Sequence, residues 1–185
     1  MKKLLILIAL GLGISSYAQT EESFIDPDHY VVKTNGDTIF GKLKYMSSDD
    51  IKMKISVKVN DTLNYNLKAS EVAYFRDGDK EYLTFQPEGE TGHFFLKILQ
   101  RGSYLNLYEW QIPLDGGGGR IEFYHYIQKQ GEKDYIELAV HWQKHLVEFI
   151  DDYEELADDV WRNKYKTDQL GEVIRKYNEW KEENK

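Results

Sequence analysis

Residues 51–59 read IKMKISVKV, and apolar and polar side chains alternate along the whole stretch. Its odd-numbered positions hold isoleucine, methionine and valine, whereas its even-numbered positions hold lysine and serine. Successive side chains of a β-strand point to opposite faces of the sheet, so this pattern predicts a strand with one face on a core and the other in water.

Turn residues separate this strand from its neighbours at the spacing of hairpins. Asn35-Gly36, Asn60-Asp61 and Asp77-Gly78 each lie between alternating or β-rich segments. Such pairs tolerate the positive φ of tight turns, so the flanking segments should pair antiparallel. No stretch long enough for a helical crossover intervenes. The sequence predicts a mainly antiparallel meander of about ten short strands, at residues 29–34, 37–45, 51–59, 62–67, 72–76, 80–85, 92–101, 103–112, 120–129 and 133–139.

The apolar spacing becomes helical from about Val140 onward. Apolar residues then recur at intervals of three and four, in two stripes: Leu146, Phe149, Ile150, Tyr153, Leu156, Ala157, Val160 and Trp161, and then Leu170, Val173, Ile174, Tyr177 and Trp180. Thr167 is a candidate N-cap for the second stripe, and Glu172 precedes Lys176 by four residues. These stripes need a surface to cover, so we predict an α+β fold in which a C-terminal pair or trio of amphipathic helices packs on the sheet.

The first residues have the pattern of a secretory signal peptide. Lys2 and Lys3 precede an apolar run over residues 4–14, and Ser16-Tyr17-Ala18 follows, so cleavage is expected after Ala18. The run is shorter than the roughly 20 residues that a membrane span needs. We therefore expect a signal peptide at 1–18, an antiparallel β region at 19–139 and a helical region at 140–185 in one domain with it, secreted or periplasmic and without a membrane span after cleavage.

Composition limits the partners and the chemistry. The formal net charge of −8 repels nucleic-acid phosphates, so a nucleic-acid partner is not expected. The chain has no cysteine, which removes disulfides, thiolate metal sites and cysteine nucleophiles. No cofactor is predicted.

The glycine run Gly116 to Gly119 raises the question of a phosphate loop. A P-loop ends in Lys and Ser or Thr and leads into a helix, but here Arg120 leads into the alternating segment IEFYHYI. The run is therefore interpreted as a flexible connection between two strands.

HWQKH, at residues 141–145, is the pattern closest to a metal site. His141 and His145 are four residues apart, so on a helix they would share a face, and Glu148 lies one turn further on. The zincin signature needs Glu directly after the first His, where this chain has Trp142. Two interpretations therefore remain: a metal site at these three residues, or two histidines on a solvated helix.

The acidic stretch DDYEELADD, residues 151–159, lacks the spacing of a calcium loop. Its charges fit a helix start, in which Asp151 or Asp152 caps a helix with Glu154 and Glu155 in its first turn.

Aromatic residues are the most informative excess. Tyr104, Tyr108 and Trp110 share one side of the segment SYLNLYEWQI, and Tyr124 and Tyr126 share one side of IEFYHYI. If the two strands pair, these rings form a platform suited to sugar rings or a partner protein. The alternative is that they are the surface that the C-terminal helices cover.

The quoted motifs resemble a group of exported proteins. YVVKTNGDTIFGKLKY, FYHYIQKQGEKDYIEL and a helical tail ending in IRKYNEW are similar to those of exported proteins of Bacteroidetes-type bacteria for which no activity is defined. Relatives often have Pro before the E-L pair, where this chain has Glu154. Such bacteria attach O-glycans at Asp followed by Ser or Thr and a small or apolar residue, which implies Thr38 and Thr62 as candidate sites.

No specific catalytic signature is present, which favours a non-catalytic binding or interaction module of the cell envelope, acting on another envelope protein or a glycan. The alternatives are a metal- or carboxylate-dependent hydrolase built around His141, His145 and Glu148, and a structural envelope component.

Overall fold

The computed structural model describes residues 26–44, 54–89, 91–113 and 121–185. The predicted signal peptide with its cleavage site after Ala18, the glycine run Gly116 to Gly119 and the first three residues of IKMKISVKV lie outside the described residues. The described part has strands β1 His29–Lys33, β2 Thr38–Phe40, β3 Lys42–Lys44, β4 Lys54–Lys58, β5 Asn64–Lys68, β6 Val72–Asp77, β7 Lys80–Phe85, β8 Phe94–Gln100, β9 Leu105–Pro113, β10 Ile121–Lys129 and β11 Ile136–Leu138. Its helices are α1 Trp142–Ile150, α2 Glu154–Trp161 and α3 Leu170–Glu183, with short 3-10 turns η1 Ala69–Glu71 and η2 Thr167–Gln169.

The strands form two antiparallel sheets. The larger has eight strands in the order β11-β10-β9-β8-β7-β6-β1-β2, and the smaller has three in the order β3-β4-β5. All three predicted hairpins are present, because β1 pairs with β2, β4 with β5 and β6 with β7. The α+β class, with C-terminal helices packed on an antiparallel meander, is therefore confirmed.

One predicted strand, residues 37–45, is broken in two at Gly41. The backbone there has φ 157° and carries the chain from β2 in the large sheet to β3 in the small one. The Gly41 amide donates to the carbonyl of His29, and a Cβ on Gly41 would lie 2.5 Å from the carbonyl oxygen of Lys58. The break thus depends on a residue without a side chain.

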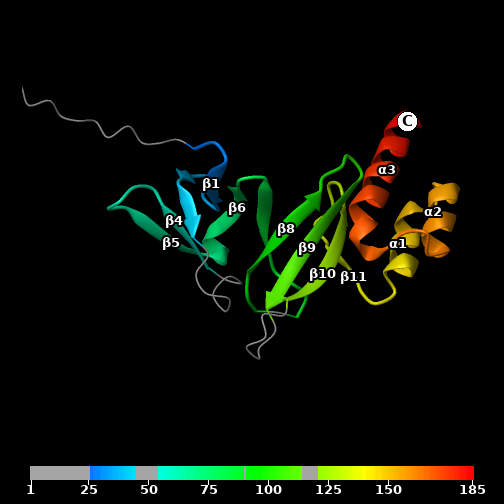
Figure 1. Ribbon diagram of the computed structural model, residues 1–185, viewed down its shortest axis with the longest axis horizontal. Helices are drawn as coiled ribbons and strands as arrows, with labels where there is room; N and C mark the ends of the chain where they lie inside the picture. Colours follow the sequence, from blue (N-terminus) through cyan, green and yellow to red (C-terminus); the bar gives the residue numbers. More distant parts are fainter. Residues whose placement is uncertain (1–25, 45–53, 90, 114–120) are drawn as a thin grey trace, which may run out of the picture.

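The molecule is elongated, with the small sheet at one end and the helices at the other (Figure 1). At the first end, the small sheet packs on β1 and β6 around buried residues that include Val31, Ile55, Val57 and Phe75. At the second, Leu107, Ile127 and Leu138 of the large sheet pack against the apolar stripes of the helices. The stripes of α1 and α3 therefore cover the sheet, and that of α2 packs in the same core against α1, except for Trp161, which is 59% exposed.

The small sheet and the helices both lie on the same face of the large sheet. Phe75 is opposite Tyr82, Tyr82 opposite Lys97 and Lys97 opposite Glu109 in the strand register. Leu107 shares the parity of Glu109, so it points to the same side as Phe75. The other face of the sheet carries neither the small sheet nor the helices.

The helix ends differ from the expected caps. The residue before α2 is Tyr153. Because α1 ends at Ile150, Asp151 and Asp152 lie in the connection, and neither caps α2. Asp152 instead forms an ion pair with Lys181 of α3. Thr167 opens the 3-10 turn before α3 rather than capping α3 itself. The predicted pair of Glu172 and Lys176 is present at 2.8 Å.

None of the described helices is long and apolar enough to cross a membrane.

Candidate functional site

Strands β9 and β10 bring four of the predicted aromatic residues together. Tyr108 lies opposite Tyr126 and Trp110 opposite Tyr124, so all four point to one face of the sheet. Their neighbours Leu107 and Ile127 point to the other face, into the core beneath the helices. The two strands therefore pair, which was the condition of the platform hypothesis, and four of the five predicted residues share a face; Tyr104 does not.

The helices do not cover this platform. Tyr108 and Tyr126 belong to a cluster that contains no helical residue, and the helices pack on the opposite side of β9 and β10. The alternative that these rings lie under the helices applies to Tyr104 alone. Tyr104 precedes β9, packs against the helical core and donates from its hydroxyl to the carbonyl of Lys181 at 3.4 Å.

Three further aromatic residues complete the cluster, which we call the aromatic face. They are Phe85 of β7, Phe94 of β8 and Tyr135 of the connection between β10 and β11. The ring of Phe85 makes edge contacts with Trp110, Tyr126 and Tyr135, at centroid distances of 5.6, 5.3 and 5.9 Å. Such tilted contacts are favourable for aromatic pairs. The aromatic face thus consists of Phe85, Phe94, Tyr108, Trp110, Tyr124, Tyr126 and Tyr135.

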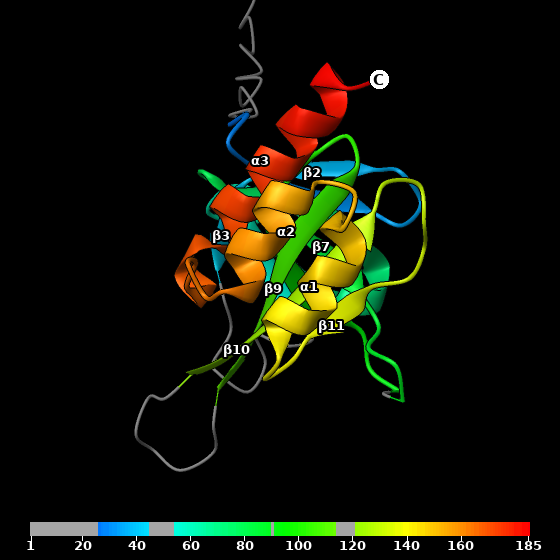
Figure 2. The same ribbon diagram turned by 90° about the vertical axis from the view of Figure 1, so that its right-hand side faces the viewer.

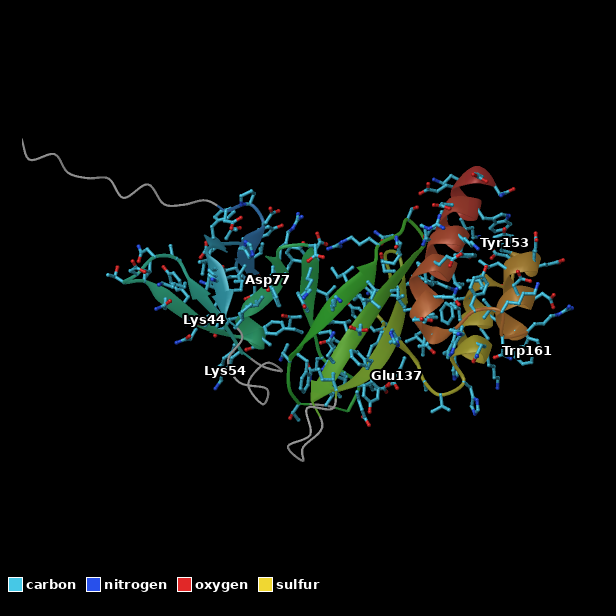
Figure 3. The ribbon with its side chains drawn as sticks, in the orientation of Figure 1. Lys44, Lys54, Asp77, Glu137, Tyr153 and Trp161 are labelled. Carbon is cyan, nitrogen blue, oxygen red and sulfur yellow. The ribbon has the colours of Figure 1, made fainter. Side chains whose placement is uncertain are left out.

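The seven rings are not equally accessible. Phe85, Phe94, Tyr108 and Tyr126 are buried and form a base, whereas Trp110, Tyr124 and Tyr135 are only partly buried. Beside them is a hollow of about 710 Å³ between the segment after β7 and the segment before β11. Phe85, Tyr126 and Tyr135 line it together with the carboxylates Glu88, Asp134 and Glu137. Glu137 lies at the sheet edge in Figure 3.

The phenol hydroxyls of this face donate hydrogen bonds to nearby acceptors. The hydroxyl of Tyr108 donates to Oε1 of Gln128 at 2.9 Å, and that of Tyr124 donates to Oε2 of Glu122 at 2.8 Å. Burial raises the pKa of Tyr108 to about 12. Burial, followed by the charge of Glu137, raises the pKa of Tyr126. These phenols stay protonated at neutral pH, so the face offers stacking surfaces and hydrogen bonds rather than an acid–base group.

The structure does not assemble the predicted metal ligands. Within the described residues, no three or more His, Asp or Glu side chains are grouped so that they could hold a metal ion. His141 precedes α1 instead of lying within it, so it does not share a helical face with His145 in the way that the spacing suggested. Glu148 lines a hollow together with Asp151 and Asp152, and neither histidine is among its lining residues. His141, His145 and Glu148 therefore provide no metal centre.

The two candidate glycosylation residues are exposed at turns of the β region. Thr38 begins β2, and Thr62 lies between β4 and β5, where its hydroxyl donates to the side-chain oxygen of Asn60 at 3.1 Å. Both remain predictions.

Sequence reasoning did not find Phe85, Phe94 or Tyr135 as members of the site. Phe85 is the last residue of β7, and Phe94 is the first residue of β8. Their place in the alternating pattern was visible in the sequence, but their contact with Trp110 depends on the strand order. Tyr135 comes from a connection, where no periodicity exists. No protein-family model, no curated protein and no solved structure gives a significant match to this chain.

Proposed function

We propose that the protein is an exported, non-catalytic binding module of the cell envelope whose aromatic face binds a glycan. The observation that carries this proposal is the aromatic face, in which the partly exposed rings of Trp110, Tyr124 and Tyr135 lie over four buried rings, on the side of the sheet that the helices leave bare and beside a hollow of about 710 Å³. Tyrosine and tryptophan rings suit a sugar, because they combine apolar area with hydrogen-bonding tips.

The charges around the hollow narrow the ligand class. Glu88, Asp134 and Glu137 line it, and Lys133 is the basic residue among the lining residues. Carboxylates accept hydrogen bonds from sugar hydroxyls but repel anionic groups. A neutral oligosaccharide therefore fits better than a sulfated or uronic-acid polymer. A protein partner on the same face is the competing interpretation.

The test is a titration with neutral oligosaccharides, using maltohexaose, cellohexaose and a mannan fragment as probes and isothermal calorimetry as the measurement. Binding by at least one probe is expected. Tyr135→Ala removes a partly buried ring at the hollow, and Trp110→Ala removes one beside it; each should weaken the affinity about tenfold, since a stacked ring contributes about 1.5 kcal/mol.

Trp161→Ala is the matched control. Trp161 is 59% exposed on α2, at the helical end of the molecule (Figure 3), so its loss should leave the affinity unchanged. Circular dichroism of each variant establishes that it is folded. Absence of binding by every probe, or equal weakening by Trp161→Ala, contradicts the glycan proposal.

A further inference from the structure

The outer edge of β10 is only partly paired. β11 is three residues long and pairs with His125, Tyr126 and Ile127 alone. Residues 121–124 of β10 pair with β9 on their inner side, and no described residue pairs with their outer side. Backbone N–H and C=O groups of an unpaired edge are a template for another strand.

Glu122 is the one charged residue on this edge, which otherwise lacks the usual protection against pairing. Phe123 is 53% exposed and Ile121 is 46% exposed, and neither Lys nor Pro occurs among residues 121–124. The outer strand of the small sheet, β5, instead carries Asn64, Asn66 and Lys68. Charged and polar residues commonly prevent edge-to-edge association, so this mainly apolar edge of β10 is less protected than that of β5.

A hollow of about 660 Å³ lies along the same edge. After Leu138 the chain leaves the sheet and turns into α1, so the position that a longer β11 would occupy stays open. Phe123, Val140 and Trp142 supply apolar walls, and Val140 is 89% exposed. The far ends of β9 and β10 extend past the helices (Figure 2). A segment entering this hollow would lie beside β10 in line with β11.

The charges that line the hollow are mainly negative. Glu109, Glu137 and Asp168 line it with His125. The side chains of His125 and Glu109 are 14% and 13% exposed, and Nε2 of His125 lies 3.7 Å from Oε2 of Glu109. Burial lowers the pKa of His125, which favours the neutral imidazole, although the charge of Glu109 acts in the opposite direction.

We propose that the open edge of β10 binds a basic, extended peptide segment of a partner protein, which adds as a strand beside residues 121–124. Its apolar side chains would contact Phe123 and Val140, and its basic side chains, on the opposite face of the added strand, would face Glu122 and Glu137. Strand addition of this kind obtains affinity from backbone hydrogen bonds and specificity from alternate side chains. A second copy of this chain fits less well, because it would bring its own acidic Glu122 to the edge.

The peptide edge and the aromatic face are separate proposals. They share Glu137, which lines both hollows, and Tyr124, which belongs to the aromatic face and also lines the hollow at the edge of β10, so both residues are left unchanged in both experiments. Oligosaccharide binding can fail while peptide binding succeeds, and the reverse.

The probe is a short capped peptide in which valine and lysine alternate, titrated into the full chain by calorimetry. Binding that weakens as salt is added is expected, because the charges of an exposed hollow are screened. Phe123→Ser should weaken the affinity about tenfold through lost apolar contact. Hydrogen exchange should slow at the amides of residues 121–124 on binding.

Two controls make the result specific. Tyr65→Ser removes a 39% exposed ring from β5, at the edge of the small sheet, and should leave the affinity unchanged. A peptide in which valine and glutamate alternate should not bind. Equal binding of the glutamate peptide, equal weakening by the two serine variants, or protection at β5 instead of β10 overturns the proposal. Formation of a dimer that protects residues 121–124 without peptide also overturns it and assigns the edge to a second copy.

Discussion

Asn178 is the residue that joins the last helix to the sheet. Its Oδ1 accepts from the amides of Tyr104 and Leu105, and its Nδ2 donates to the carbonyls of Leu105 and Ile174. The side chain is buried at 7% exposure, yet every polar atom has a partner. The sequence did not predict this role, because an asparagine on an apolar helical stripe has no periodic signal and its partners Tyr104 and Leu105 lie more than 70 residues away.

Replacement of Asn178 by leucine should destabilise the fold strongly. The amides of Tyr104 and Leu105 and the carbonyl of Leu105 would lose a partner in a buried place, and Asn178→Leu should lower the free energy of unfolding by about 3 kcal/mol. Urea denaturation measures this. Asn184→Leu is the control, because Asn184 bonds the Trp180 carbonyl at an exposed helix end and its loss should cost less than about 0.5 kcal/mol.

Gly102 gives an independent check on the same contact. A Cβ on Gly102 would lie 2.1 Å from Nδ2 of Asn178. Gly102→Ala should therefore destabilise the parent protein but cost much less in an Asn178→Ala background, where the amide is absent. Equal costs in the two backgrounds would show that Asn178 is not held in place by these bonds.

At the scale of elements, the strand periods and hairpin turns were predictable, because a half-buried strand must alternate and a tight turn needs particular residues. Once β9 and β10 pair, the shared face of Trp110 and Tyr124 follows from that alternation. The division into two sheets could not be predicted, since Gly41 in DTIFGKLKY looks like one more residue of a strand. The side of the sheet that the helices cover could not be predicted either, because β9 and β10 carry apolar or aromatic residues on both faces.

Gly41→Ala tests the junction between the two sheets. The new Cβ would meet the backbone oxygen of Lys58 at 2.5 Å, and the backbone φ of 157° disfavours a side chain. Relief would require β3 and β4 to separate, so the free energy of unfolding should fall by about 2 kcal/mol or more.

Gly171→Ala provides the matched control for this substitution. Gly171 lies in α3, and a Cβ there would meet nothing within 4 Å. The same change should raise the free energy of unfolding by about 0.5–1 kcal/mol through helix propensity. A Gly41→Ala protein as stable as the parent would show that the junction tolerates a side chain.

At the scale of the whole molecule, the covered face carries two cores that share no residue. One lies under the small sheet around Val57, and the other lies under the helices around Leu146. The eight-stranded sheet joins them over its length, as Figure 1 shows. Separate cores of this kind often open as separate units.

Hydrogen exchange followed by mass spectrometry should resolve these units. Val57→Ala and Leu146→Ala each remove side-chain volume from one core, where both residues are 0% exposed. Val57→Ala should speed exchange in β3 to β5 and leave α3 slow, and Leu146→Ala should do the opposite. Each variant serves as the control for the other, and equal acceleration at both ends would show one cooperative unit.

The position of α3 in the chain has a consequence for synthesis. Leu105 and Asn178 are 73 residues apart, whereas β6 to β10 each pair with the strand that follows in the chain. The strands can pair as they emerge from the ribosome, but the amides of Tyr104 and Leu105 and the apolar side of β9 stay open until α3 has been made. We expect a nascent chain that stops before residue 170 to expose the apolar side of the sheet, which is the form that chaperones would have to shield.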